Sequence, residues 1–194
     1  GLMLVLAGGV ALVALASASR GWDARGRYFH ALYQFQLVGL NGAFLTGDLF
    51  NLFVFFEILL IASYCLLAHG LGAARLRAAL HYVVINLAAS ALFLVAVSLL
   101  YGVTGTLNMA DLAARAAQAS TADAPLIGAG ALLLLVVFGV KAAAFPLYFW
   151  LPGAYTTAAA PVAALFAIMT KVGVYAIIRV HGQVFGPEAG AVAS

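Results

Sequence analysis

The sequence predicts an all-α integral membrane protein, and three observations carry this prediction. Hydrophobic residues make up 66% of the 194 residues and charged residues only 8%, whereas soluble domains carry about 25% charged residues. The apolar residues gather in runs long enough to cross a bilayer as helices, which takes about 20 residues. The runs do not alternate between apolar and polar positions as the strands of a membrane β-barrel do, and the single cysteine excludes a disulfide scaffold.

We expect six transmembrane helices in a single module that covers residues 1–194. Their approximate spans are 2–19, 28–46, 49–69, 80–103, 126–151 and 158–185. Between the fourth and fifth spans, the segment at about 107–118 carries Asp111 and Arg115 beside apolar residues. Such a segment is expected to lie as a short helix at the membrane interface.

Arginines between the spans predict the orientation of the module. The loops at about 20–27 and 70–79 lie on one side, whereas the opposite side carries Arg115. The arginines of these two loops are Arg20, Arg25, Arg27, Arg75 and Arg77. Cytoplasmic loops carry the excess of basic residues, so we expect these two loops to be cytoplasmic. Because the basic residues alternate with apolar runs and do not form one stripe, no nucleic-acid partner is predicted.

Three charged residues lie within the predicted spans, where a charged side chain is energetically unfavourable. Glu57 is near the middle of the third span, Lys141 is in the fifth and Lys171 is near the centre of the sixth. A charged side chain at the bilayer centre costs about 2.5 to 3.5 kcal/mol, so these side chains should face the bundle interior or a water-filled cavity. One carboxylate with two ammonium groups suits a proton relay, while a buried Glu–Lys pair as a structural clip is the alternative.

The fifth span is predicted to be broken next to its lysine. Pro146 follows Lys141 closely and has no N–H to donate to the carbonyl of Ala142. That carbonyl would be free to bind water or an ion, and broken helices of this kind form midplane sites in transporters. The alternative is an ordinary proline kink that neighbouring helices repair.

Other polar residues are candidates for supporting roles. In the fourth span, His81, Asn86 and Ser90 could extend a hydrogen-bonded chain, although interhelical contacts would explain them equally well. Tyr64 shares a helix face with Glu57 and could orient its carboxylate, or it could simply pack. Cys65 is expected to be a small buried hydrophobic residue. No nucleotide-binding, cysteine-cluster or histidine-rich motif is present, so neither a cofactor nor a metal is predicted.

Four strings of the sequence resemble a known family. They are 46–57 (TGDLFNLFVFFE), 101–112 (YGVTGTLNMADL), 138–152 (FGVKAAAFPLYFWLP) and 170–175 (TKVGVY). They are similar to the proton-translocating antiporter-like subunits that bacterial Mrp-type (Pha or Mnh) antiporters share with NADH:quinone oxidoreductases. The string at 46–57 is most like the D-type subunits of the Mrp-type antiporters.

This resemblance implies a fold and a set of roles. The last five spans would form one inverted repeat of the antiporter-like fold, within a longer polypeptide of which this chain is an internal piece. Glu57 would match the essential carboxylate of the family, Lys141 its paired lysine on the broken helix, and Lys171 the next lysine of the proton relay.

The resemblance also implies an activity and a setting. The chain would belong to a secondary ion transporter, not an enzyme, in the bacterial plasma membrane. Its partners would be the other subunits of a hetero-oligomeric complex, the lipid bilayer, H⁺, and Na⁺ or K⁺. Two alternatives stay open: a proton-pumping membrane subunit of a redox-driven NADH:quinone oxidoreductase-like complex, and a structural scaffold.

Overall fold

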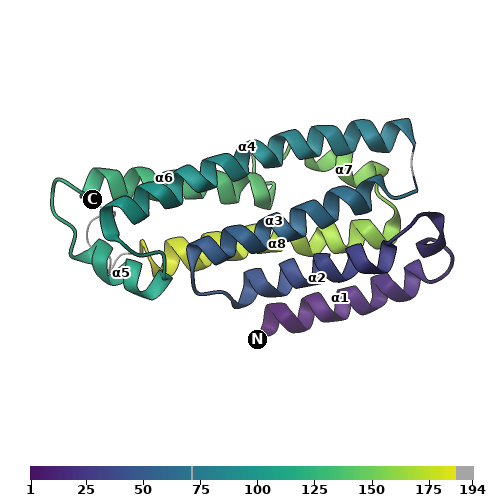
Figure 1. The fold of residues 1–194 in the computed structure, drawn as a ribbon, viewed down its shortest axis with the longest axis horizontal. Helices are drawn as coiled ribbons and strands as arrows, with labels where there is room; N and C mark the ends of the chain where they lie inside the picture. The colour runs from purple at the N-terminus through teal and green to yellow at the C-terminus, as the bar shows by residue number, and fades with distance from the viewer. Residues whose placement is uncertain (71, 187–194) are drawn as a thin grey trace.

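The computed structural model describes residues 1–70 and 72–186, which form an elongated bundle of helices (Figure 1). Residues 187–194 of the predicted module lie outside this description. The elements are α1 (Leu2–Ala18), the 3₁₀ helix η1 (Asp23–Arg25), α2 (Phe29–Leu45), α3 (Leu49–Ala68), α4 (Ala73–Thr104), α5 (Met109–Ala117), α6 (Ala124–Ala142), α7 (Leu151–Thr157) and α8 (Ala160–Gln183). The all-α prediction is confirmed.

Four helices of the described chain, α3, α4, α6 and α8, are long and apolar enough to cross a membrane. The 20 residues of α3 span about 30 Å, the thickness of the hydrocarbon core. The chain is therefore a multi-pass membrane protein. The helix α1 is apolar but shorter, with 17 residues, and α2 has the same length. Membrane spanning by α1 and α2 stays a prediction.

Three helix boundaries refine the sequence expectations. The helix α4 begins at Ala73 and not near residue 80, so Arg75 and Arg77 lie in its first turns. The predicted span 126–151 is not one helix, because α6 ends at Ala142, residues 143–150 are not helical, and α7 begins only at Leu151. The helix α5 falls inside the predicted interfacial segment; it buries Met109, Leu112 and Ala116 and exposes Asp111 and Arg115.

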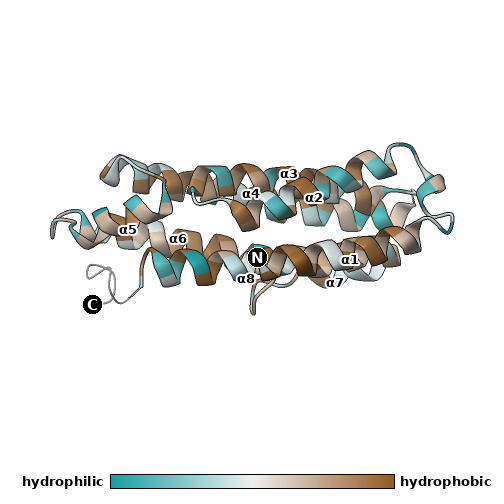
Figure 2. Cartoon of the chain, turned by 90° about the horizontal axis from the view of Figure 1, so that it is seen from below, coloured by the Kyte–Doolittle hydropathy of each residue, from teal (hydrophilic) through white to brown (hydrophobic). Residues whose placement is uncertain are grey.

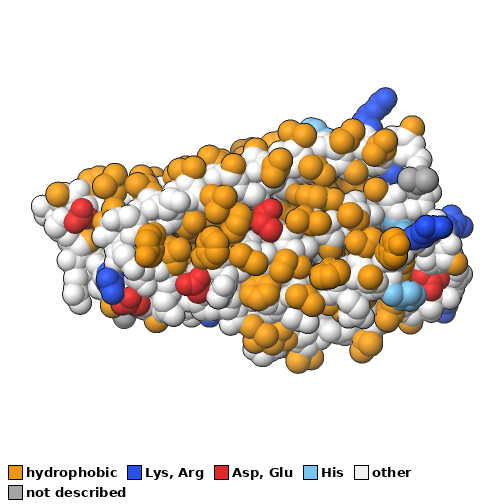
Figure 3. All heavy atoms as spheres, in the orientation of Figure 1, with side chains coloured by type: hydrophobic (Ala, Val, Ile, Leu, Met, Phe, Trp, Pro, Cys, Tyr) orange, Lys and Arg blue, Asp and Glu red, His pale blue; other side chains and the backbone are white. Residues whose placement is uncertain are grey.

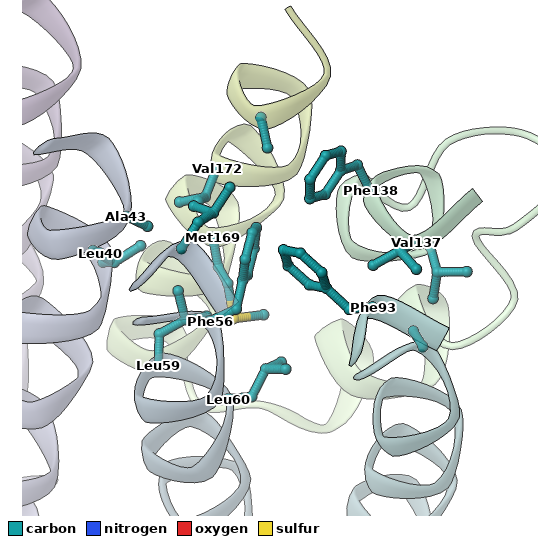
Figure 4. Packing of buried hydrophobic residues seen from close by; sticks show 14 of the residues in the cluster. Leu40, Ala43, Phe56, Leu59, Leu60, Phe93, Val137, Phe138, Met169 and Val172 are labelled. Carbon is teal, nitrogen blue, oxygen red and sulfur yellow. The ribbon is translucent and has the colours of Figure 1, made fainter. Parts of the chain in front are cut away.

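Close side-chain fit holds the bundle together. Lipid tails are as apolar as the helices, so helices in a membrane associate through tight packing and polar contacts and not through the hydrophobic effect. Along the bundle α2 packs on α3, α3 on α4, α4 on α6, and α6 on α8. Figure 4 shows Phe56, Phe93 and Phe138 converging between α3, α4 and α6. Their ring centroids lie 5.3 to 6.2 Å apart.

The outer surface of the bundle is largely hydrophobic, as a lipid-facing surface requires. Figure 3 shows hydrophobic side chains over the middle of one face and most charged groups toward its ends. Hydrophobic residues also run along α1 in the hydropathy view (Figure 2). The expectation that Cys65 is buried is wrong, because this free cysteine is exposed on α3. A residue with no polar contact to make can face lipid as readily as core.

Candidate functional site

The helix α3 places Glu57, and both its start and its packing are well defined. The carboxylate of Asp48 accepts a hydrogen bond from the N–H of Asn51 at 2.9 Å and so caps the helix. Asp48 also forms an isolated antiparallel bridge with Asn108, which caps α5. This bridge ties the two loops at one end of the bundle together. Glu57, two turns into α3, is half-buried.

The helix α6 places Lys141 in its last turn. The helix stops because Ala143 adopts a left-handed conformation, with φ of 53°. The N–H of Ala144 then bonds the carbonyl of Gly139 at 2.9 Å, and the N–H of Ala143 bonds the carbonyl of Val140 at 3.1 Å. This pair of bonds is a Schellman motif, which satisfies carbonyls that a helix end leaves free. A cation in the last turn is favoured by the helix dipole.

Trp150 completes the end of α6 from the other side of the break. Its indole N–H donates a hydrogen bond to the carbonyl of Val140 at 2.8 Å. Its ring stacks on Tyr82 of α4 with centroids 4.9 Å apart, and the side chain is only 1% exposed. The segment after α6 therefore folds back and packs against the lysine-bearing end of that helix.

Ser90 of α4 joins the carboxylate to the first lysine. Its hydroxyl donates a hydrogen bond to Glu57 Oε1, and the same oxygen accepts one from Lys141 Nζ at 3.2 Å. The Lys141 ammonium also lies 5.0 Å from the centroid of the Phe56 ring, which provides cation–π attraction. Lys141 is 3% exposed. Among the described residues no direct ion pair links Glu57 and Lys141, so Ser90 is the bridge between them.

Further polar groups continue along the buried face of α4. Asn86 donates from its side chain to the carbonyl of Tyr82 at 3.1 Å. The Tyr82 hydroxyl lies 2.8 Å from Ser63 Oγ and 3.3 Å from the sulfur of Met169, which the amide of Gln36 also reaches, at 3.8 Å. Sequence reasoning missed this cluster. The four-residue spacing of 82, 86 and 90 would have predicted that Tyr82 shares a face with Asn86 and Ser90.

Lys171 lies apart from this cluster. It is exposed on α8, and its Nζ donates a long hydrogen bond to the Thr170 hydroxyl, at 3.5 Å. The structure thus brings Glu57, Ser90 and Lys141 together and leaves Lys171 on an open face of the described chain.

Three other sequence candidates occupy positions away from the charges. Tyr64 packs edge-on against Tyr82 with centroids 5.0 Å apart, and within the described chain it makes no hydrogen bond to Glu57. His81 is exposed and lies 6.5 Å from the ring of Phe149. Pro146 is exposed in the segment after α6 and does not itself interrupt that helix, since α6 has already ended at Ala142.

The cluster combines a carboxylate, a hydroxyl and an ammonium group. In the described part of the chain no group of three or more His, Cys, Asp or Glu side chains could hold a metal ion. A carboxylate, a hydroxyl and an ammonium in one hydrogen-bonded line can pass protons, because each group can donate or accept in turn. Their burial makes every change of charge strongly dependent on the neighbouring groups.

Sequence comparison relates the chain to membrane transporters. The family described as NADH:quinone oxidoreductase/Mrp antiporter, TM, matches residues 46–192. The chain is 57% identical over 190 residues to the D-type subunit of a probable K⁺/H⁺ antiporter of Rhizobium meliloti, covering 98% of this chain and 35% of that protein. It is 48% identical over 192 residues to the D-type subunit of the Na⁺/H⁺ antiporter of Alkalihalophilus pseudofirmus, covering 97% and 38%.

Comparison with solved structures also finds a similar chain in an Mrp complex. The chain is similar to one chain in the solved structure of the Mrp complex from Dietzia sp., with a TM-score of 0.87 and 37% identity. The similarity covers 95% of this chain and 34% of that chain. The chain thus spans little more than a third of the length of the proteins that it matches.

Proposed function

This chain belongs to the NADH:quinone oxidoreductase/Mrp antiporter transmembrane family, and we propose that it is the part of a monovalent cation/H⁺ antiporter subunit that moves protons through Glu57, Lys141 and Lys171. The complete subunit would act within a hetero-oligomeric complex in a bacterial plasma membrane. The segments at about 20–27 and 70–79, the second of which includes the first turns of α4, would face the cytoplasm.

The observation that carries the proposal is the double contact of the Ser90 hydroxyl. It bonds Glu57 Oε1 and Lys141 Nζ at the same time, inside a bundle whose other interior side chains are mostly apolar. A structural clip would need only a direct ion pair. A hydroxyl between the two charges can instead relay a proton, because it accepts on one side and donates on the other.

In the proposed mechanism, the proton passes from Lys141 to Lys171. While Lys141 stays near Ser90 and Glu57, the carboxylate favours the protonated ammonium. When the end of α6 moves away, the ammonium loses this stabilisation and gives up its proton. The neutral amine of Lys171 accepts that proton and becomes charged. Return of the α6 end allows Lys141 to be protonated again, and the proton flow drives Na⁺ or K⁺ in the opposite direction elsewhere in the complex.

A second candidate keeps the same proton path but changes its source of energy. The matching family also includes membrane parts of NADH:quinone oxidoreductases, in which electron transfer would drive the protons. The names of the two relatives, both antiporter subunits of type D, favour the antiporter.

The test uses the complete complex in everted membrane vesicles with an imposed pH gradient. Addition of Na⁺ or K⁺ should dissipate the gradient in the unaltered complex. We expect Glu57→Gln, Lys141→Ala and Lys171→Ala each to abolish this dissipation while the complex still assembles. Asp111→Asn is the matched control, because Asp111 is an exposed carboxylate on α5, outside the site. Unchanged dissipation in all three variants would support the structural scaffold instead, and proton uptake driven only by NADH and quinone would support the redox-driven pump.

A further inference from the structure

Gly173 of α8 lies in direct backbone contact with the end of α6. A Cβ atom at this position would lie 2.4 Å from the nitrogen of Ala142, 2.7 Å from its Cα and 2.8 Å from the carbonyl carbon of Lys141. All three are backbone atoms, which cannot rotate away as a flexible side chain can. Only glycine allows α8 to approach this closely.

The contact joins the segments that carry the two lysines. On the α6 side, Lys141 belongs to the helix end that the Schellman motif and the Trp150 hydrogen bond hold in place. On the α8 side, Gly173 follows Lys171 by less than one helical turn. A displacement of either helix at this point is therefore transmitted to the other without a flexible side chain between them.

We infer that Gly173 is a positioning residue, which sets the distance of Lys141 from Ser90 and Glu57 by holding the end of α6 against α8. This inference rests on the proposed proton relay. A side chain at residue 173 would have to displace the α6 end by about 1 Å to reach an ordinary van der Waals distance. The 3.2 Å hydrogen bond from Lys141 Nζ to Ser90 Oγ does not tolerate such a change without weakening.

A glycine also allows two helices to approach closely elsewhere in the bundle, at Gly39. A Cβ at Gly39 of α2 would lie 2.6 Å from the backbone nitrogen of Leu59, which lies in the middle of α3 and not at a helix end. Gly39 brings two helices together, as small residues do throughout membrane proteins. The neighbour of Gly173, in contrast, is the helix end that bears Lys141.

The test compares Gly173→Ala with Gly182→Ala in the complete complex. Both substitutions replace a glycine of α8 by the better helix former alanine, but a Cβ at Gly182 would meet nothing within 4 Å. Cation-dependent dissipation of the pH gradient is measured in everted vesicles across a range of pH, and the amount of assembled complex on native gels. We expect Gly182→Ala to behave as the unaltered complex and Gly173→Ala to assemble but lose about tenfold to 100-fold in rate.

The pH profile separates positioning from a structural role. The distance between the ammonium of Lys141 and the carboxylate of Glu57 sets how readily Lys141 releases its proton, so Gly173→Ala should displace the profile along the pH axis. A structural defect would lower its height in proportion to the lost complex. The double variant Gly173→Ala with Ala142→Gly gives the α6 backbone freedom to adjust and should recover part of the rate.

Three results would overturn the inference. They are an unaltered rate and profile in Gly173→Ala, a loss that only follows the amount of complex, and failure of both the single and the double variant to assemble. The Glu57, Lys141 and Lys171 variants distinguish this failure from failure of the proposed function. If those three abolish transport while Gly173→Ala does not change it, only the role of Gly173 is refuted.

Discussion

The two lysines of the candidate relay have opposite surroundings. Lys141 is 3% exposed and has the Ser90 hydroxyl, the Phe56 ring and the negative end of the α6 dipole around its ammonium. Lys171 is exposed on α8 and has a long hydrogen bond to the neighbouring Thr170. Among the described residues, neighbouring groups enclose the ammonium of Lys141, whereas the side chain of Lys171 lies open.

The exposure of Lys171 has an energetic cost wherever this face of α8 meets lipid. A lysine facing lipid at mid-membrane costs about 2.5 to 3.5 kcal/mol, so polar groups or water should cover Lys171 in the complete subunit. The chain spans 35% and 38% of the lengths of the two relatives.

Replacement of each lysine by alanine should give the largest difference in stability between the two positions. Lys141→Ala leaves a void in the bundle and a half-buried Glu57 without its positive neighbour, so the complex should lose about 3 kcal/mol of stability. Lys171 has no enclosing site among the described residues, so Lys171→Ala should destabilise the complex less than Lys141→Ala does, by about 1 kcal/mol. Thermal unfolding of the purified complex measures both. Equal destabilisation by the two variants would mean that Lys171 is enclosed as tightly as Lys141.

Trp150→Phe tests whether the end of α6 is held in place from beyond the break. Phenylalanine can still stack on Tyr82, but the Val140 carbonyl loses its 2.8 Å hydrogen bond from the indole. The carbonyl keeps its hydrogen bond from the N–H of Ala143, so loss of the indole bond should lower the stability of the complex by about 0.5 to 1.5 kcal/mol and slow transport moderately. Unfolding temperature and cation-dependent proton flux are the measurements, and Phe149→Ala, at an exposed position beside it, is the control. A Trp150→Phe complex as stable as the unaltered one would leave Trp150 without this role.

The smallest change in stability is expected for a substitution on α5, outside the candidate site. The Arg115 guanidinium donates a hydrogen bond to Asp111 at 3.1 Å and holds the pKa of this exposed carboxyl below its ordinary value of 3.8. A lowered pKa means that the contact stabilises the fold above this ordinary value and is lost as the pH falls through the lowered pKa. Asp111→Asn should therefore destabilise the complex slightly at neutral pH, with a difference that vanishes in acid, and should not alter transport. A clear loss of proton flux at neutral pH would place α5 in the proton path.

The sequence predicted the elements of the site better than their connections. The isolated charges Glu57, Lys141 and Lys171 stand out because charged residues within apolar spans are rare. Pro146 indicated a broken helix, but the position of the break depends on Ala143, whose left-handed conformation no local rule for alanine predicts. Trp150 and Gly173 contact this end of α6 from later segments of the chain, and such tertiary contacts are not part of a local rule.

Burial and pairing were the least predictable features. Asn86 and Ser90 are buried as a shared helix face suggests, while His81 faces outward at the start of the same helix. Which face of an apolar helix is inside cannot be read from hydrophobic periodicity when the surrounding solvent is also apolar. For the same reason the sequence could not distinguish the enclosed Lys141 from the exposed Lys171.

The hydroxyl of Ser90 offers the most direct test of the account, because the link between Glu57 and Lys141 passes through it. Cation-dependent dissipation of a pH gradient should be measured in everted vesicles for the complete complex carrying Ser90→Ala or Ser90→Thr. Threonine keeps the hydroxyl and should retain most of the rate, whereas alanine should reduce the rate on the order of 100-fold. A Ser90→Ala complex that transports as fast as the unaltered complex would contradict the account.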